Sequence, residues 1–160
     1  MTNNLTTSDE GISFIKEHEG VVSKVYSDPI GLPTGGVGHL LSEEELLLFP
    51  LGTPLTDTQV EAWLREDVKE AENSVNTLVK VPLTQSQFDS LVSFVFNIGE
   101  TRFRTSTLLR LLNQGKYEEA ARQFPSWVYA GGRKLAGLKT RRQEELNLFL
   151  KQGEPNESSS

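Results

Sequence analysis

The 160-residue sequence contains no cysteine, so disulfides, thiolate zinc sites, iron–sulfur clusters and cysteine nucleophiles are all excluded. Long hydrophobic runs are missing too. The longest uninterrupted apolar stretch, residues 46–49, is far below the roughly eighteen residues that a membrane span needs. The first fifteen residues carry neither a basic residue nor an apolar block, so we expect no secretory signal. These absences predict a soluble protein that is made in the cytoplasm and does not insert into a membrane.

Positive charge is scarce over most of the chain. The sequence holds 22 acidic and 16 basic residues, for a net charge of −6, and eleven of the basic residues lie in 101–151. A basic C-terminal part suggests an anionic partner at that end, and the alternative is a set of solvated helix faces. No basic cluster interleaves with aromatic residues and no glycine–lysine phosphate loop is present, so nucleic acid is not expected as a partner.

Helix start signals recur along the chain. A hydroxyl residue stands three positions before Glu or Gln at Thr7, Ser42, Thr56 and Thr84, which is the pattern of a capping box. Apolar residues at three- and four-residue spacing, with Gly or Pro as stop signals, complete the pattern. They predict helices over about 8–19, from Thr56 to Pro82, from Phe88 to Gly99, and over about 105–113, 116–123 and 138–151.

The segment between Gly20 and Leu41 has a different composition. It is rich in glycine and contains β-forming valines and a tyrosine, with a turn signal at 28–31, which predicts a small twisted antiparallel sheet. The expected fold class is therefore α+β, with a sheet lobe at about 20–60 and a helical lobe formed by 1–19 and 80–151. We expect the two lobes to form one domain over 1–151 and the polar tail 152–160 to be disordered.

Two carboxylates and a hydroxyl are candidates for chemistry. Glu19 ends the first predicted helix, where the partial negative charge of the helix C-terminus disfavours an ionised carboxylate. Asp28 lies at the predicted turn of the sheet, and Thr34 begins a glycine-rich run. Glycoside hydrolysis needs one protonated carboxyl and one ionised carboxylate, but among so many acidic residues such a pair alone is weak evidence.

The order and spacing of several motifs add to that evidence. His18-Glu19-Gly20, Tyr26-x-Asp28-Pro29-x-Gly31 and the run Thr34-Gly35-Gly36-Val37-Gly38-His39 are followed by Phe96-Asn97-Ile98-Gly99-Glu100, Trp127 and Gly137-Leu138-x-x-Arg141-Arg142. Together they resemble phage-type lysozymes, the endolysin muramidases, over about residues 8–150. The resemblance implies a lysozyme-like fold, mainly helical, in which a long helix joins the two lobes.

The resemblance also implies an activity and its residues. The expected reaction is hydrolysis of the β-1,4 bond between N-acetylmuramic acid and N-acetylglucosamine in peptidoglycan, with inversion and without cofactor or metal. Glu19 would be the general acid, while Asp28 and Thr34 would hold the attacking water. Substrate contacts would fall at Leu40, Phe96, Asn97 and Thr107. Arg141 matches a family arginine that pairs with the catalytic glutamate.

Other interpretations of some residues stay open. We expect His39 to be a structural hydrogen-bonding residue, because no second histidine lies near enough for a metal pair. Arg141 also precedes Glu145 by four residues, and ordinary pairing along a helix explains such an arrangement. Alternatives to the hydrolase are a lytic transglycosylase or a catalytically silent wall-binding module. We expect a monomer that reaches the periplasmic cell wall after release through a separate pore.

Overall fold

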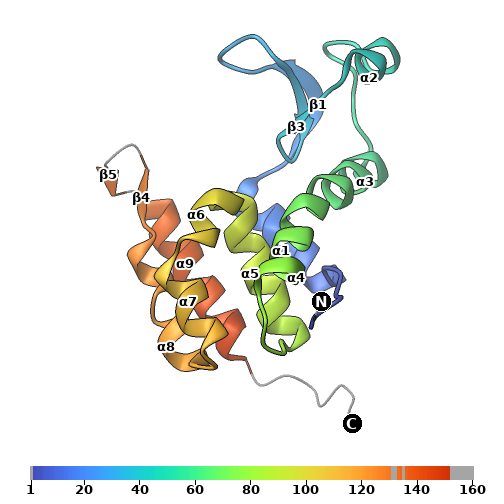
Figure 1. Cartoon of the computed structure of the whole chain (residues 1–160). Helices are drawn as coiled ribbons and strands as arrows, with labels where there is room; N and C mark the ends of the chain where they lie inside the picture. Colours follow the sequence, from blue (N-terminus) through green and yellow to red (C-terminus); the bar gives the residue numbers. More distant parts are fainter. Residues whose placement is uncertain (1, 131–132, 135, 152–160) are drawn as a thin grey trace. The chain divides into compact units, whose positions relative to one another are not determined.

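A computed structural model describes residues 2–130, 133–134 and 136–151. The chain divides into two compact units (Figure 1). The sheet unit comprises Ile12–Lys69, and the helical unit comprises Met1–Gly11 with Glu70–Ser160. The predicted disordered tail, residues 152–160, lies outside the described residues, as do 131, 132 and 135 in the loop before the last helix.

The predicted sheet is confirmed. Its three strands, β1 (Val22–Ser27), β2 (Pro33–Gly36) and β3 (His39–Leu40), are antiparallel and lie in chain order. The turn between β1 and β2 closes with a hydrogen bond of 2.9 Å from the Gly31 amide to the Asp28 carbonyl. Gly31 has a φ of 89°, a conformation that favours glycine, so the turn signal in the sequence has a direct physical cause.

The first helix, α1 (Asp9–Glu19), ends where the sequence predicts. Gly20 adopts a φ of 83°, and its amide donates to the Lys16 carbonyl at 2.8 Å. The predicted start is wrong in one detail. Ser8, not Thr7, caps the helix by accepting the Gly11 amide at 3.1 Å, because the Thr7 hydroxyl is bound to Glu72 instead.

The single helix predicted from Thr56 to Pro82 is wrong as well. The structure has α3 (Asp57–Asp67) and α4 (Lys69–Leu78), separated at Val68. The Val68 amide is shared between the Leu64 and Glu66 carbonyls, which tightens the last turn of α3 and ends it. Neither Gly nor Pro occurs between 57 and 78, so the periodicity of the sequence contains no signal for this break.

The other described elements follow in chain order. They are α2 (Glu43–Leu48) in the sheet unit, and in the helical unit α5 (Gln85–Ile98), α6 (Glu100–Arg104), α7 (Thr107–Asn113), α8 (Tyr117–Ala121), the 3-10 helix η1 (Phe124–Ser126), β4 (Tyr129–Ala130), β5 (Arg133–Lys134) and α9 (Ala136–Leu150). The capping boxes predicted at Ser42 and Thr84 are both present, at the starts of α2 and α5. The helix α6 and the β4–β5 hairpin were not predicted.

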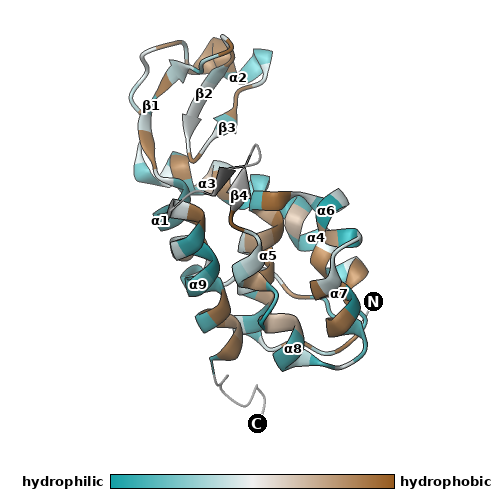
Figure 2. Cartoon of the chain, turned by 90° about the vertical axis from the view of Figure 1, so that its left-hand side faces the viewer, coloured by the Kyte–Doolittle hydropathy of each residue, from teal (hydrophilic) through white to brown (hydrophobic). Residues whose placement is uncertain are grey.

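The core of the helical unit is built around α5, the apolar helix predicted from its composition. It packs against α9 and is coloured largely as hydrophobic in Figure 2. The Phe94 ring contacts Phe103, Phe124 and Trp127 edge to face, at centroid distances of 6.3, 5.1 and 5.5 Å. In the described part of the chain, no helix has the length and hydropathy to span a membrane.

Candidate active site

Glu19 is the last residue of α1 and is exposed. The turn of the chain at Gly20 follows at once, and β1 begins two residues later. The carboxyl group therefore lies where the chain passes from α1 to the sheet of the same unit. It is close to the C-terminus of the helix, which carries a partial negative charge.

Asp28 is fixed by its own turn. Its Oδ1 accepts the amides of Ile30 at 3.0 Å and Leu32 at 2.8 Å, an arrangement that Asp commonly makes in turns. Among the described residues nothing donates to the other oxygen, Oδ2. Asp28 thus presents one anchored oxygen and one that is available to another molecule.

Thr34 lies on β2, directly opposite Tyr26 and Leu40 in the neighbouring strands. Its side chain is buried, with 4% exposed, and its hydroxyl donates to the Leu32 carbonyl at 3.0 Å. Since the hydroxyl proton is used in this bond, the Thr34 oxygen can only accept from a further molecule. Leu40, the expected substrate contact of this unit, is 57% exposed.

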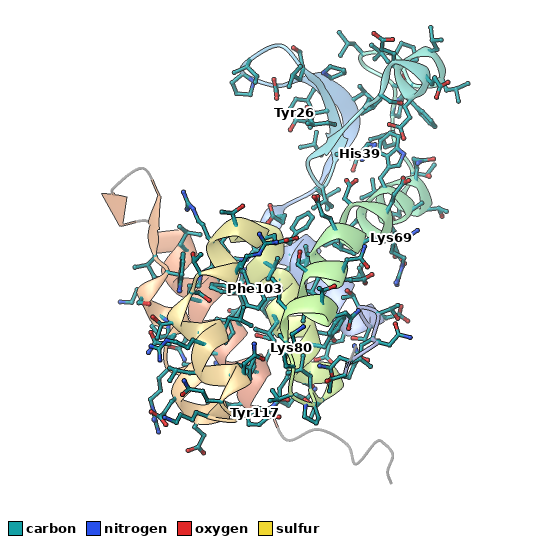
Figure 3. The ribbon with its side chains drawn as sticks, viewed as in Figure 1. Tyr26, His39, Lys69, Lys80, Phe103 and Tyr117 are labelled. Carbon is teal, nitrogen blue, oxygen red and sulfur yellow. The ribbon has the colours of Figure 1, made fainter. Side chains whose placement is uncertain are left out.

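His39, labelled in Figure 3, belongs to β3. Its ring lies between two carboxylates. Its Nδ1 is 2.8 Å from Asp67 and its Nε2 is 2.9 Å from Glu45, while its ring stacks on Trp63 at 4.4 Å. Both ring nitrogens face acceptors, so the doubly protonated imidazolium fits this site. Burial alone would lower the pKa of His39, but the hydrogen bonds to Glu45 and Asp67 outweigh it and raise the pKa.

The remaining expected contacts belong to the helical unit. Phe96 is half-buried and Asn97 is exposed, both near the end of α5, and Thr107 is the exposed first residue of α7. The hydroxyl of the preceding residue, Ser106, caps α7 by accepting the Leu109 amide at 3.1 Å. The N-cap of α7 is therefore Ser106 and not Thr107.

Arg141 is buried on α9, with 4% exposed. It donates to Glu145 at 3.2 Å, the pairing along the helix that the sequence predicts, and to the Ser93 carbonyl at 3.0 Å. Arg142 and Glu145 are buried beside it, and Arg142 is also bound to Asn97, neither of which the sequence predicts. The only signal for this cluster was the spacing of the two arginines from Glu145, which is equally typical of an exposed helix face.

Neither unit presents a metal centre in its described residues. No group of three or more His, Asp or Glu side chains among them is arranged to hold a metal ion. A mainly helical fold that carries a short three-stranded antiparallel sheet after its first helix is the arrangement of a lysozyme-like protein.

Comparisons with known proteins agree with this class. The family model described as Phage lysozyme matches residues 16–145. An endolysin of Acyrthosiphon pisum secondary endosymbiont phage 1 is 43% identical over 146 residues, covering 89% of this chain and 96% of that protein. The chain belongs to the phage lysozyme family, and it is an enzyme of the glycoside hydrolase class.

Two solved structures are also similar. A mutant of the lysozyme from phage P22 superposes with a TM-score of 0.84 at 37% identity, covering 92% of this chain and all of that one. The muramidase domain of SpmX from Asticaccaulis excentricus gives a TM-score of 0.81 at 37% identity and covers 93% of this chain. The lysozyme-like α+β fold expected from the sequence is thereby confirmed.

Proposed function

We propose that the protein is a muramidase that hydrolyses the β-1,4 bond between N-acetylmuramic acid and N-acetylglucosamine in peptidoglycan. The observation that carries this proposal is the shared attachment of Asp28 and Thr34 to Leu32, which holds both acceptor groups at one residue of the sheet unit. A water molecule bound to both groups donates both of its hydrogens, so its lone pair is directed away from them and toward a substrate.

The proposed reaction assigns one role to each group. Glu19 transfers its proton to the glycosidic oxygen while the bond from that oxygen to the anomeric carbon breaks. The oxygen of the held water forms the new bond to the anomeric carbon, and Asp28 takes the proton that the water loses. Water attack from the face opposite the leaving group gives inversion at the anomeric carbon, which NMR of the fresh product tests directly.

Substrate contacts are proposed residue by residue. Leu40, exposed beside Thr34 on the neighbouring strand, offers an apolar surface to a sugar ring. Phe96, Asn97 and Thr107 are proposed as contacts of the helical unit, and Arg141 as a partner of the catalytic glutamate. The protein is proposed to act as a monomer on the periplasmic wall, which it reaches through a pore formed by another protein.

Mass spectrometry of a peptidoglycan digest tests the proposed reaction. A hydrolase yields muropeptides with reducing ends, whereas a lytic transglycosylase yields anhydro products that are lighter by one water. The position of Asp28 and Thr34 favours the hydrolase, because ring closure needs an acid but no held water. Anhydro products would contradict the proposal, and an unchanged wall would mean a binding module.

A further inference from the structure

The side chain of Arg142 joins three segments of the helical unit. It extends from α9 with only 1% of its surface exposed, and its guanidinium lies over the Phe94 ring at 5.0 Å from the centroid. Its Nε donates to the Trp127 carbonyl at 2.9 Å, and its two terminal nitrogens donate to Glu145 and to the Asn97 side-chain oxygen. The planar group therefore has little freedom to move.

Glu145 holds this arginine in place from the same helix. The carboxylate is fully buried and both of its oxygens are used. Oε1 accepts from Arg142, while Oε2 accepts from the Ser93 hydroxyl at 2.6 Å and from Arg141 at 3.2 Å. Because each oxygen has a partner on a packed helix, Glu145 fixes the direction in which Arg142 presents its remaining donors.

Asn97 is the point at which this buried cluster reaches the surface. An arginine has only donors, so the amide oxygen of Asn97 must face Arg142 and the amide nitrogen must face the other way. Asn97 is exposed, and its Nδ2 has no hydrogen-bond partner among the residues that the structure describes. An unrestrained asparagine can turn either end of its amide to a ligand, whereas this one turns its oxygen to Arg142 and its two N–H donors outward.

We infer that Arg142, held by Glu145, is a positioning residue that makes Asn97 specific for acceptor oxygens of the glycan, such as an acetamido carbonyl or a sugar hydroxyl. This inference rests on the proposed function, since it takes Asn97 as a substrate contact. It goes beyond that function by naming the groups that fix the amide and the chemistry that the amide selects. A ligand group that can only donate, such as a protonated amine in place of the acetamide, gains no hydrogen bond from these outward donors.

Asn97→Asp is the decisive variant, because it keeps an oxygen for Arg142 and removes the N–H donors. On soluble, uncross-linked glycan strands we expect its KM to rise about 2- to 10-fold, as for the loss of one hydrogen bond, with kcat within about twofold of the wild-type value. Its thermal midpoint stays at or above that of the wild type, because the new carboxylate faces a guanidinium. A wild-type KM for this variant would overturn the inference.

Arg142→Met tests the positioning role. It leaves Arg141 and Glu145 as a balanced pair, and we expect a KM rise similar to that of Asn97→Asp. In an Asn97→Ala background the same substitution should change KM by less than about twofold, because its effect runs through Asn97. An equal rise in KM in the wild-type and the Asn97→Ala backgrounds would overturn the inference. If the Arg142→Met variant does not fold, the KM of Asn97→Asp decides alone.

Ser90→Ala is the matched control for loss of packing. The buried Ser90 hydroxyl donates to the Glu145 carbonyl at 2.6 Å, so its removal weakens the same contact between α5 and α9 without touching Asn97. We expect a lower thermal midpoint and an unchanged KM. The experiment also distinguishes failure of this inference from failure of the proposed function. If the proposed function is wrong, the wild-type protein itself releases no reducing ends from the glycan.

Discussion

Asp28 and Thr34 both bind the backbone of one residue, Leu32. The Asp28 carboxylate accepts the Leu32 amide at 2.8 Å, and the Thr34 hydroxyl donates to the Leu32 carbonyl at 3.0 Å. The turn between β1 and β2 thus sets the positions of both groups together. Each keeps an acceptor for a further molecule, which is the basis of the proposed water site.

Asp28→Asn separates the catalytic role of this carboxylate from its role in the turn. The Asn oxygen still accepts the amides of Ile30 and Leu32, so we expect the free energy of unfolding to change by less than about 1 kcal/mol. The loss of the base should lower the rate of wall lysis by about 10²–10⁴-fold. Lysis assays and thermal melts check both expectations. Activity near that of the wild type would remove Asp28 from the water site.

Thr34→Val removes the hydroxyl and keeps the shape of the side chain. The Leu32 carbonyl still accepts the Asp28 amide at 2.9 Å, so no buried acceptor is left without a donor and stability should change little. We expect the rate of lysis to fall by about 10-fold or more, whereas Thr34→Ser, which keeps the hydroxyl, retains most of it. Equal activities of the Val and Ser variants would contradict the role of the hydroxyl.

The cluster of His39, Glu45 and Asp67 makes stability depend on pH. Burial lowers the pKa of His39, but hydrogen bonds to two carboxylates outweigh it and raise the pKa above the ordinary 6.5, so the folded protein holds the proton more tightly than the unfolded chain. This contribution is complete below pH 6.5 and is lost as the pH rises through the raised pKa. On the acid side, burial opposes ionisation of Glu45, but hydrogen bonds from Ser42 and His39 lower its pKa below 4.5, so its contribution is lost as the pH falls through that lowered value.

Thermal melts of the wild type and of His39→Gln from about pH 5 to about pH 9 check this expectation. The difference between their midpoints should be largest near the acid end and should shrink as the pH rises. The third group of the cluster, Asp67, does not add to stability in the way that Glu45 does. Burial raises the pKa of Asp67, although its bond to His39 opposes that shift, so Asp67 takes up a proton more readily in the folded protein. A difference that stays constant over the whole range would mean that His39 stabilises the unit through packing on Trp63 alone.

Glu145→Gln should be strongly destabilising. It removes the buried carboxylate that the guanidinium groups of Arg141 and Arg142 share, and the loss of one partner of a buried ion pair costs about 3–5 kcal/mol. An exposed glutamate of the same unit gives a control, since Glu119→Gln on α8 should change the free energy of unfolding by less than about 0.5 kcal/mol. Denaturant unfolding measures both. A loss below about 1 kcal/mol for Glu145→Gln would contradict the account of the cluster.

The parts of the fold that the sequence predicts are those with a local cause. Gly20, the turn at 28–31 and the capping boxes at Ser42 and Thr84 each depend on a few consecutive residues. The break at Val68 depends on how one amide is shared within the last turn of α3, which no residue type marks. The helix α6 is only five residues long and starts directly after Gly99, so its sequence resembles a loop.

The residues of the candidate site also divide into those with a local signal in the sequence and those that depend on packing. Glu19, Asp28 and Thr34 lie within sixteen residues of one another, and their motifs are visible in the sequence. The bond from Arg142 to Asn97 spans 45 positions, and the burial of Glu145 depends on the packing of α9 against α5. Spacing along a helix is the same for a buried ion pair and for a solvated one, so only the structure distinguishes them.

The most direct test of the proposed mechanism is the rate at which Glu19→Gln clears a suspension of purified peptidoglycan, compared with Glu17→Gln. Both glutamates are exposed on α1, and glutamine keeps the size of the side chain, so we expect both variants to fold. We predict that Glu19→Gln lowers the rate by about 10²–10⁴-fold or more, because the amide cannot donate the proton that the leaving oxygen needs, and that Glu17→Gln stays within about twofold of the wild type. Clearing by Glu19→Gln at a rate near that of the wild type would contradict the assignment of the general acid.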